Sequence, residues 1–200
     1  MDLIILYLYP PMSISTTSWS EGCFCTDQDV VDMDMGGYKY KMIKSINFYS
    51  YARKQLNKTN HIVWIQDMVE NVTRAGEVFT VTTSKTAYSA KLVFDSRISK
   101  KFDSTDDKYI RILQHFKGWR IKTESEVFDK ERFTMMDFRV KIEEKTCFTY
   151  VLPISANEAL VEFTLFTPSL LKKEEYDIKL EEYIGKVLGI QDYQIGETEL

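Results

Sequence analysis

The chain has 200 residues, of which 44% are hydrophobic and 14% aromatic, and its formal net charge is -4. This length and hydrophobic content can bury one sizeable core or parts of two. Basic side chains are scattered among acidic ones, so the sequence carries no electrostatic footprint for nucleic acid. The 12 Tyr and 12 Phe residues fit an aromatic-rich core, the commoner arrangement, or a large apolar pocket.

Cysteine and histidine usage limits the chemistry further. The three cysteines, Cys23, Cys25 and Cys147, do not have the number or spacing of a disulfide framework. The Cys-x-Cys pair has no further ligands at metal-site spacing, and only His61 and His115 remain in the chain. We therefore predict no metal site, reduced cysteines and a cytoplasmic location.

The first 37 residues give no clear structural pattern. Residues 3–9 are apolar but too few to span a bilayer, and no basic residue precedes them as in a signal peptide. A Ser/Thr-rich stretch follows at residues 13–20. The sequence predicts a poorly specified segment over residues 1–37 and no transmembrane segment.

The periodicity of the next stretch changes from helix to strand. Phe48, Ala52 and Leu56 recur at helical spacing and predict a helix over residues 44–57. A short strand is predicted at residues 61–66. Alternation then predicts a hairpin within residues 77–97, whose second strand covers residues 88–94 and is closed by Asp95. The charged residues 99–107 are the best candidate for a boundary.

The rest of the chain is predicted to be mainly strands. Short links connect five apolar stretches, at residues 109–116, 119–122, 133–142, 148–152 and 160–166. Such an order favours an antiparallel sheet. A helix is predicted after Thr167-Pro168-Ser169, with an apolar stripe that includes Tyr176, Leu180 and Tyr183 and with Gly189 as its C-terminal cap. The fold class indicated is α+β, a multi-stranded sheet with covering helices.

Carboxylates inside apolar strands are the candidate catalytic groups. The chain has no Gly-x-Gly-x-x-Gly, P-loop, Gly-x-Ser-x-Gly or His-Glu-x-x-His motif. Asp95, Asp137 and Glu162 lie within apolar stretches, where desolvation raises a carboxyl pKa and makes the group a general acid. Each has a plainer interpretation as well. Glu162 would be an exposed residue of an edge strand, Asp137 a partner of Arg139, and Asp95 a strand-end cap.

Six short motifs occur in an order that resembles one enzyme family. They are "VFDSR" (93–97), "QHFKGW" (114–119), "VFD" (127–129), "MMDFR" (135–139), "FTYVLP" (148–153) and "ALVEFT" (159–164). From about residue 38 to residue 200 the chain resembles the flavin-dependent lycopene cyclases of carotenoid biosynthesis, particularly the bacterial β-cyclases.

The resemblance implies a two-domain, aromatic-hydroxylase-like α/β fold that binds FAD. Residues 38–98 would be an incomplete FAD-binding portion, and residues 99–200 a substrate-binding domain with an antiparallel sheet and a helix. The family's Gly-x-Gly-x-x-Gly turn, which holds the flavin pyrophosphate at a helix N-terminus, is missing from this sequence. The family's Ile-Pro-Met run is missing too, so the sequence is expected to be an internal fragment.

The implied reaction is the cyclisation of lycopene to a β-ring carotenoid, β-carotene. An acid protonates the terminal double bond, a neighbouring double bond attacks the carbocation, and proton loss leaves the ring with no net redox change. Reduced FAD, with NAD(P)H as reductant, would stabilise the cationic character electrostatically. The substrate lives in lipid, so contact with the inner face of the membrane is an expectation.

The resemblance also assigns roles to individual residues. "LVEFT" matches the family's Phe-Leu-Glu-Glu-Thr motif with Glu162 at the first Glu and Phe163 replacing the second. Glu162 is the first candidate for the acid, and Asp137, oriented by Arg139, is the second. The candidate cation-stabilising aromatics of the substrate site are Trp119, Phe138 and Tyr150, and the plainer interpretation of each is an ordinary residue of the sheet. Asp95 is expected near the ribityl chain of the flavin.

Two other functions stay open. Flavin monooxygenases and geranylgeranyl reductases share this general architecture but perform redox chemistry. The chain would otherwise be a non-catalytic domain that binds lipophilic molecules.

Overall fold

The computed structural model describes residues 14–58, 60–98 and 110–200, and the chain divides into two compact units. The first unit combines the chain up to Arg53 with Arg111–Leu200, and the second is Lys54–Ile110. The sequence had placed divisions after residues 37 and 98. The structure divides the chain differently because N-terminal strands pair with strands of the C-terminal half.

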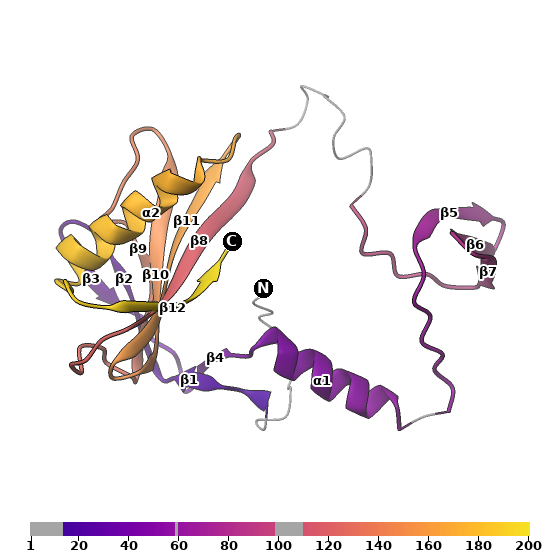
Figure 1. Ribbon diagram of the computed structural model, residues 1–200, viewed down its shortest axis with the longest axis horizontal. Coiled ribbons are helices and arrows are strands. Elements are labelled where there is room, and N and C mark those ends of the chain that lie inside the picture. Colours follow the sequence, from indigo (N-terminus) through magenta and orange to yellow (C-terminus); the bar gives the residue numbers. More distant parts are fainter. Residues whose placement is uncertain (1–13, 59, 99–109) are drawn as a thin grey trace. The chain divides into compact units, whose positions relative to one another are not determined.

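The first unit is built on a seven-stranded sheet with the strand order β12-β8-β11-β10-β9-β2-β3 (Figure 1). Its strands are β2 (Glu21–Cys25), β3 (Val30–Asp32), β8 (Leu113–Lys122), β9 (Arg132–Asp137), β10 (Thr146–Ser155), β11 (Glu158–Thr167) and β12 (Gln194–Glu199). Neighbouring strands are antiparallel except for β2 and β9, which are parallel. The predicted α+β class and antiparallel sheet are confirmed, with three strands, β2, β3 and β12, that the sequence did not indicate.

Strand boundaries differ from the predicted ones where pairing overrides local composition. The strands predicted at residues 109–116 and 119–122 are parts of the single strand β8. This strand begins at Leu113, because residues 110–112 are not in a strand and residue 109 lies outside the described residues. Strand β8 runs through Lys117 and Gly118 because every residue of it pairs with β11, from Leu113 with Thr167 to Lys122 with Glu158. The predicted strand at 133–142 ends at Asp137.

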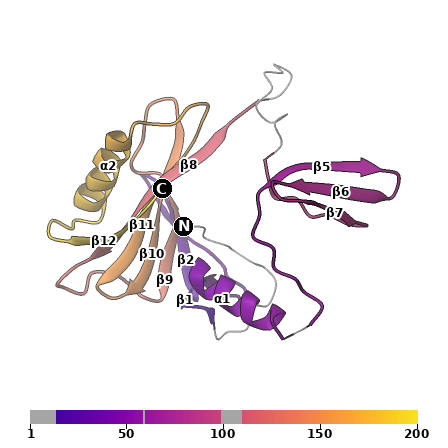
Figure 2. The same cartoon turned by 45° about the vertical axis from the view of Figure 1, so that its right-hand side comes forward.

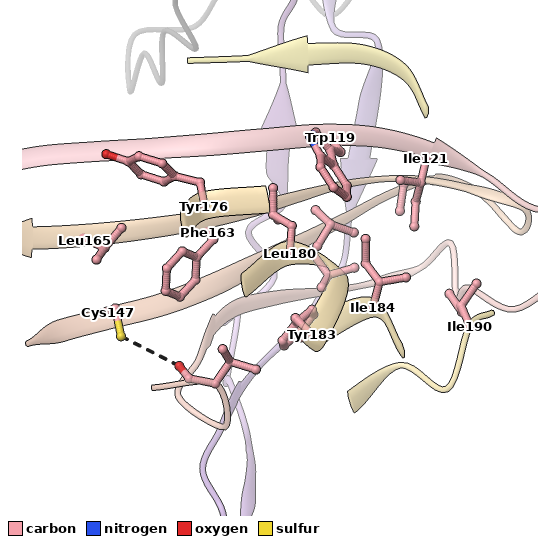
Figure 3. Packing of buried hydrophobic residues seen from close by; sticks show 14 residues of the cluster. Trp119, Ile121, Cys147, Phe163, Leu165, Tyr176, Leu180, Tyr183, Ile184 and Ile190 are labelled. Atoms are coloured by element: carbon pink, nitrogen blue, oxygen red, sulfur yellow. Dashed lines mark hydrogen bonds between the residues drawn. The ribbon is translucent and has the colours of Figure 1, made fainter. Parts of the chain in front are cut away.

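One face of this sheet is covered by helix α2 (Lys173–Glu182) and the π-helical turn η3 (Tyr183–Val187), as Figures 1 and 2 show for α2. Their buried side chains Tyr176, Leu180, Tyr183 and Ile184 pack into one apolar cluster with Val161, Phe163 and Leu165 of β11 (Figure 3). Gly189 has a φ of +70°, the left-handed conformation that suits the predicted helix cap. The predicted C-terminal helix is confirmed, with its start at Lys173.

A second, smaller cluster involves the N-terminal strands β1 (Thr17–Trp19) and β4 (Tyr40–Met42), which pair with each other. Trp19 is buried, and its Nε1 donates a hydrogen bond of 2.8 Å to the carbonyl oxygen of Pro153. Tyr40 stacks on Phe133 with ring centroids 4.5 Å apart. The described residues of the N-terminal segment are therefore ordered, in contrast to the poorly specified segment predicted from sequence.

The second unit contains a three-stranded antiparallel sheet, β5-β6-β7. Its strands are β5 (Val69–Ala75), β6 (Val78–Thr83) and β7 (Ala87–Ala90). The predicted hairpin corresponds to β6 and β7, but β7 ends at Ala90, and no described strand pairs with the apolar residues after it. Phe94 is accordingly 91% exposed. Residues 61–66, where a strand was predicted, form no strand, and the next strand along the chain is β5.

Helix α1 (Ser45–Leu56) matches the helix predicted at residues 44–57. None of its residues is buried, so its apolar stripe packs into neither cluster.

Candidate active site

Strand alternation gives β11 two different faces. Val161, Phe163 and Leu165 point into the helix-covered cluster. Glu162 points to the opposite face, where its direct cross-strand neighbours are Tyr150 on β10 and Gly118 on β8. We call this side of the sheet, opposite to α2, the Glu162 face.

Four aromatic rings gather on the Glu162 face. The ring of Phe148 lies edge-on to Tyr150, with centroids 5.1 Å apart, and also contacts Phe138 at 5.9 Å and Phe166 at 6.1 Å. Two of the predicted substrate-site aromatics, Phe138 and Tyr150, are thus brought to the same face as Glu162. Phe148 and Phe166 were missed, although their positions an even number of residues from Tyr150 and Glu162 put them on this face.

Glu162 is a carboxyl group with an elevated pKa. Burial raises its pKa to about 7, and the nearby charge of Glu199 adds to this, while a hydrogen bond from Thr164 opposes it. That bond runs 2.9 Å from Thr164 Oγ1 to Glu162 Oε1. Glu162 therefore holds a proton up to neutral pH beside an aromatic cluster, which is the arrangement expected of a general acid.

Gly118 and Tyr40 shape the immediate surroundings of Glu162. A Cβ atom at residue 118 would lie 3.5 Å from both Cβ and Cγ of Glu162, so glycine leaves free the space over which this side chain leans. Burial, with the charges of Tyr150 and Glu162, raises the pKa of Tyr40 to about 12. Tyr40 therefore remains a neutral hydroxyl near the carboxyl group.

Asp137, the second candidate acid, lies on the opposite face. It pairs with Thr149, which pairs in turn with Phe163 of the helix-covered cluster. Asp137 is fully buried, its carboxylate accepts hydrogen bonds from the Arg139 guanidinium, and Tyr183 Oη donates to its Oδ2 at 2.7 Å. Burial alone would raise the pKa of Asp137, but these hydrogen bonds hold it below its usual value.

Asp137 and Arg139 thus form an ionised structural network with Tyr183 rather than a proton donor and its orienting partner. The network connects β9 to η3 beneath the sheet. The predicted pairing of the two residues is present, but their catalytic roles gain no support from the geometry.

Trp119 is also on the helix-covered side. It pairs with Val161, lies 6% exposed within the cluster beneath α2 and points there in Figure 3. Trp119 therefore lies on the opposite face of the sheet from Glu162, because adjacent residues of one continuous strand point to opposite faces. The substrate contact predicted for Trp119 stays a prediction.

Asp95 lies in the second unit. Both of its carboxylate oxygens accept hydrogen bonds from the Arg97 guanidinium, at 2.9 Å from Nε and 2.8 Å from Nη2. Arg97 Nη1 also donates to the carbonyl oxygen of Val69 at 2.9 Å, which ties this turn to the start of β5. The hydrogen bonds from Arg97 lower the pKa of Asp95 to about 2. The flavin contact predicted for Asp95 stays a prediction.

His115 is buried, and both of its ring nitrogens have hydrogen-bond partners. One ring nitrogen hydrogen-bonds Thr167 Oγ1 at 2.7 Å, and the other pairs with the hydroxyl of Tyr176. Burial lowers the pKa of His115, so the imidazole is neutral. Its hydrogen bonds connect β8 with β11 and α2.

In the part of the chain that the structure describes, no group of three or more His, Cys, Asp or Glu side chains is placed to hold a metal ion. None of the helices in this part has the length and apolarity needed to cross a membrane.

Comparison with protein families decides the relationship that the motifs suggested. The family described as "Lycopene cyclase protein" matches residues 12–200. The chain belongs to this family. No curated protein matches the sequence.

Solved structures similar to this lycopene cyclase family member are flavoprotein-type enzymes. A geranylgeranyl bacteriochlorophyll reductase-like protein from Thermoplasma acidophilum has a TM-score of 0.62 and 13% identity over 95% of this chain and 51% of its own. A flavoprotein/dehydrogenase from Cytophaga hutchinsonii has a TM-score of 0.61 and 15% identity over 92% and 50%. The halogenase PltM, solved with phloroglucinol and FAD, has a TM-score of 0.58 and 10% identity over 92% and 43%.

These similarities show a shared fold. The chain spans about half the length of the solved proteins.

The elevated pKa of Glu162 predicts a pH dependence of folding. In the unfolded chain the carboxyl group ionises near its ordinary pKa of 4.5, whereas in the folded chain burial raises the pKa to about 7. The protonated folded state is therefore favoured below pH 4.5, and this contribution to stability is lost as the pH rises to about 7. We expect urea unfolding at pH 5 and pH 8 to show a fall in the free energy of unfolding that is smaller in Glu162→Gln. An equal fall in both proteins would contradict the assignment.

Proposed function

We propose that this chain carries the proton-donating site of a lycopene cyclase, which closes the ends of lycopene into β-rings and yields β-carotene. The observation that carries the proposal is Glu162, a carboxyl group with its pKa raised to about 7, on the same sheet face as the rings of Phe138, Phe148, Tyr150 and Phe166. An uncharged polyene offers no polar handle, so apolar and aromatic surface must hold it.

The chemistry follows from these groups. The carboxyl proton of Glu162 passes to the terminal double bond, a neighbouring double bond attacks the resulting cation and forms the ring bond, and a ring carbon then loses a proton. One proton enters and one leaves, so no net oxidation or reduction occurs. Aromatic faces such as those of Tyr150 and Phe148 stabilise the cation during this sequence.

Reduced FAD with NAD(P)H as reductant belongs to the proposal because the family is flavin-dependent. The sequence has no Gly-x-Gly-x-x-Gly turn, and both oxygens of Asp95 already bind Arg97. We therefore assign no step of the reaction to a flavin contact in this chain. Because lycopene lives in lipid, the proposal includes contact with the inner face of the membrane from the cytoplasm.

The test is to complete the chain with the flanking segments of a related cyclase and to express the chimera in bacteria that accumulate lycopene. We expect a carotenoid with cyclised ends and a mass equal to that of lycopene. A reductase would instead add hydrogen and raise the product mass. Unchanged lycopene in cells that contain folded, FAD-loaded chimera would contradict the proposal.

A further inference from the structure

A second carboxyl group lies in line with Glu162 across the sheet. Glu199 on β12 pairs with Gly118 on β8, and Gly118 pairs with Glu162 on β11. The three residues therefore form a row perpendicular to the strands, with both glutamates on the Glu162 face. Glu199 is only 8% exposed although it belongs to an edge strand whose other residues are all exposed.

The residue between the two carboxyl groups is a glycine, which adds no side chain of its own to the row. Adjacent strands are about 4.8 Å apart, so the Cα atoms of Glu162 and Glu199 are separated by roughly 10 Å. Leu160 lies closest to the space above Gly118, with its Cδ1 3.2 Å from the position that a Cβ of residue 118 would take. The Cβ and Cγ of Glu162 each lie 3.5 Å from the position that a Cβ of residue 118 would take, so the side chain of Glu162 leans over Gly118.

The charges around this row do not neutralise it. Among the described residues, no Lys or Arg forms an ion pair with Glu162 or Glu199, and the hydrogen bond to Glu162 comes from the neutral hydroxyl of Thr164. Among the described residues, the neighbouring titratable groups are Tyr40 and Tyr150 around Glu162, and Glu197 and Lys44 around Glu199. Of these only Lys44 is cationic, and its charge lowers the pKa of Glu199, whereas burial raises it.

We propose that Glu162 and Glu199 form a coupled carboxyl pair across Gly118 that retains one proton near neutral pH, with Glu199 as the positioning residue for the proton on Glu162. Two carboxyl groups that share a poorly solvated site cannot both ionise easily, so ionisation of one keeps the other protonated. This inference rests on the proposed function, and it adds a residue that the ordered motifs did not include.

The pair has a consequence for the reaction. While Glu199 is anionic, Glu162 keeps its proton at neutral pH and is ready to donate it. After the proton passes to the double bond, two negative charges face the new cation. They stabilise the cation and make the Glu162 carboxylate a stronger base for the proton that the ring must lose. The donated proton and the recovered proton balance.

The pair can be tested without any catalytic assay. The full 200-residue chain is labelled with 13C-glutamate, and the carboxyl resonances of Glu162 and Glu199 are followed by NMR as the pH is raised. We expect Glu199→Gln to lower the pKa of Glu162 by part of its rise above 4.5, because burial is the larger cause of that rise and the charge of Glu199 the smaller one. Glu197→Gln is the matched control, because Glu197 lies on the same strand with a side chain that is 51% exposed, and it should leave Glu162 nearly unchanged.

Reciprocity provides the second measurement. Because coupling between two sites is mutual, Glu162→Gln should lower the pKa of Glu199 by the same amount. An unchanged pKa of Glu162 in Glu199→Gln would overturn the pair. If Glu199→Gln did not fold, two other results would overturn the pair. One is that both carboxyl groups of the native chain titrate independently, each in a single step. The other is that the pKa of Glu199 is unchanged in Glu162→Gln. The titration and the product assay can fail separately, so the pair and the cyclase function are tested independently.

Discussion

Replacing Glu162 by Gln in the completed chimera is expected to reduce the formation of cyclised carotenoid by about 10³-fold, the range in which the loss of a general acid normally falls. Gln has nearly the size of Glu and can still accept the hydrogen bond from Thr164 Oγ1, so the strand should remain in place. What it cannot do is give up a carboxyl proton. The measurement is the carotenoid profile of lycopene-accumulating cells, normalised to the amount of soluble protein.

Glu158→Gln is the matched control for this experiment. Glu158 lies on the same strand and the same face, but its carboxylate is paired with Arg120 at 2.6 Å. Glu158→Gln also replaces a glutamate of this face by its amide, but it does not remove a protonated carboxyl group, and cyclised product should still form. Full activity in Glu162→Gln would eliminate Glu162 as the acid, whatever the control shows.

Strand alternation predicts the face of the sheet on which Glu162 lies, while the family resemblance made this residue the candidate acid. Val161, Phe163 and Leu165 are all fully buried, so the opposite face of β11 could be assigned from the pattern alone. The same principle places Trp119. The sequence predicts two strands separated before residue 119, whereas the structure has one continuous strand, and its alternation puts Trp119 under α2.

Other parts of the site carry no pattern that a sequence could show. Strand β12 has five exposed residues out of six, so its composition resembles a loop, and Glu199 becomes notable only through its pairing with Gly118. The short strands at the N-terminus are similar. They are stabilised by contacts with residues far away in the sequence, such as that between Trp19 and Pro153. The local hydrophobic pattern of the sequence does not indicate such contacts.

Asp137→Ala is expected to lower the free energy of unfolding of the first unit by about 1–3 kcal/mol, the usual cost of leaving a buried polar group without its hydrogen-bond partner. The substitution leaves the fully buried hydroxyl of Tyr183 without its acceptor and the guanidinium of Arg139 without its carboxylate. Urea unfolding, combined with hydrogen exchange of the amides in β9 and β10, would measure the loss in the unit concerned. Asp27→Ala is the control, because the Asp27–Lys141 pair is exposed on both sides and should contribute no more than about 1 kcal/mol.

Comparing Asp137 with Glu162 distinguishes a structural carboxylate from a reacting one. The pKa of Asp137 is lowered, so its contribution to stability is present above the ordinary pKa of an aspartate and is lost as the pH falls. The contribution of Glu162 runs in the opposite direction, because its pKa is raised. Asp137→Ala should therefore reduce product only in proportion to the loss of folded protein, whereas Glu162→Gln should abolish product in protein that remains folded. A stable Asp137→Ala chimera that makes no cyclised product would reverse the assignment and place the acid on the helix-covered side of the sheet.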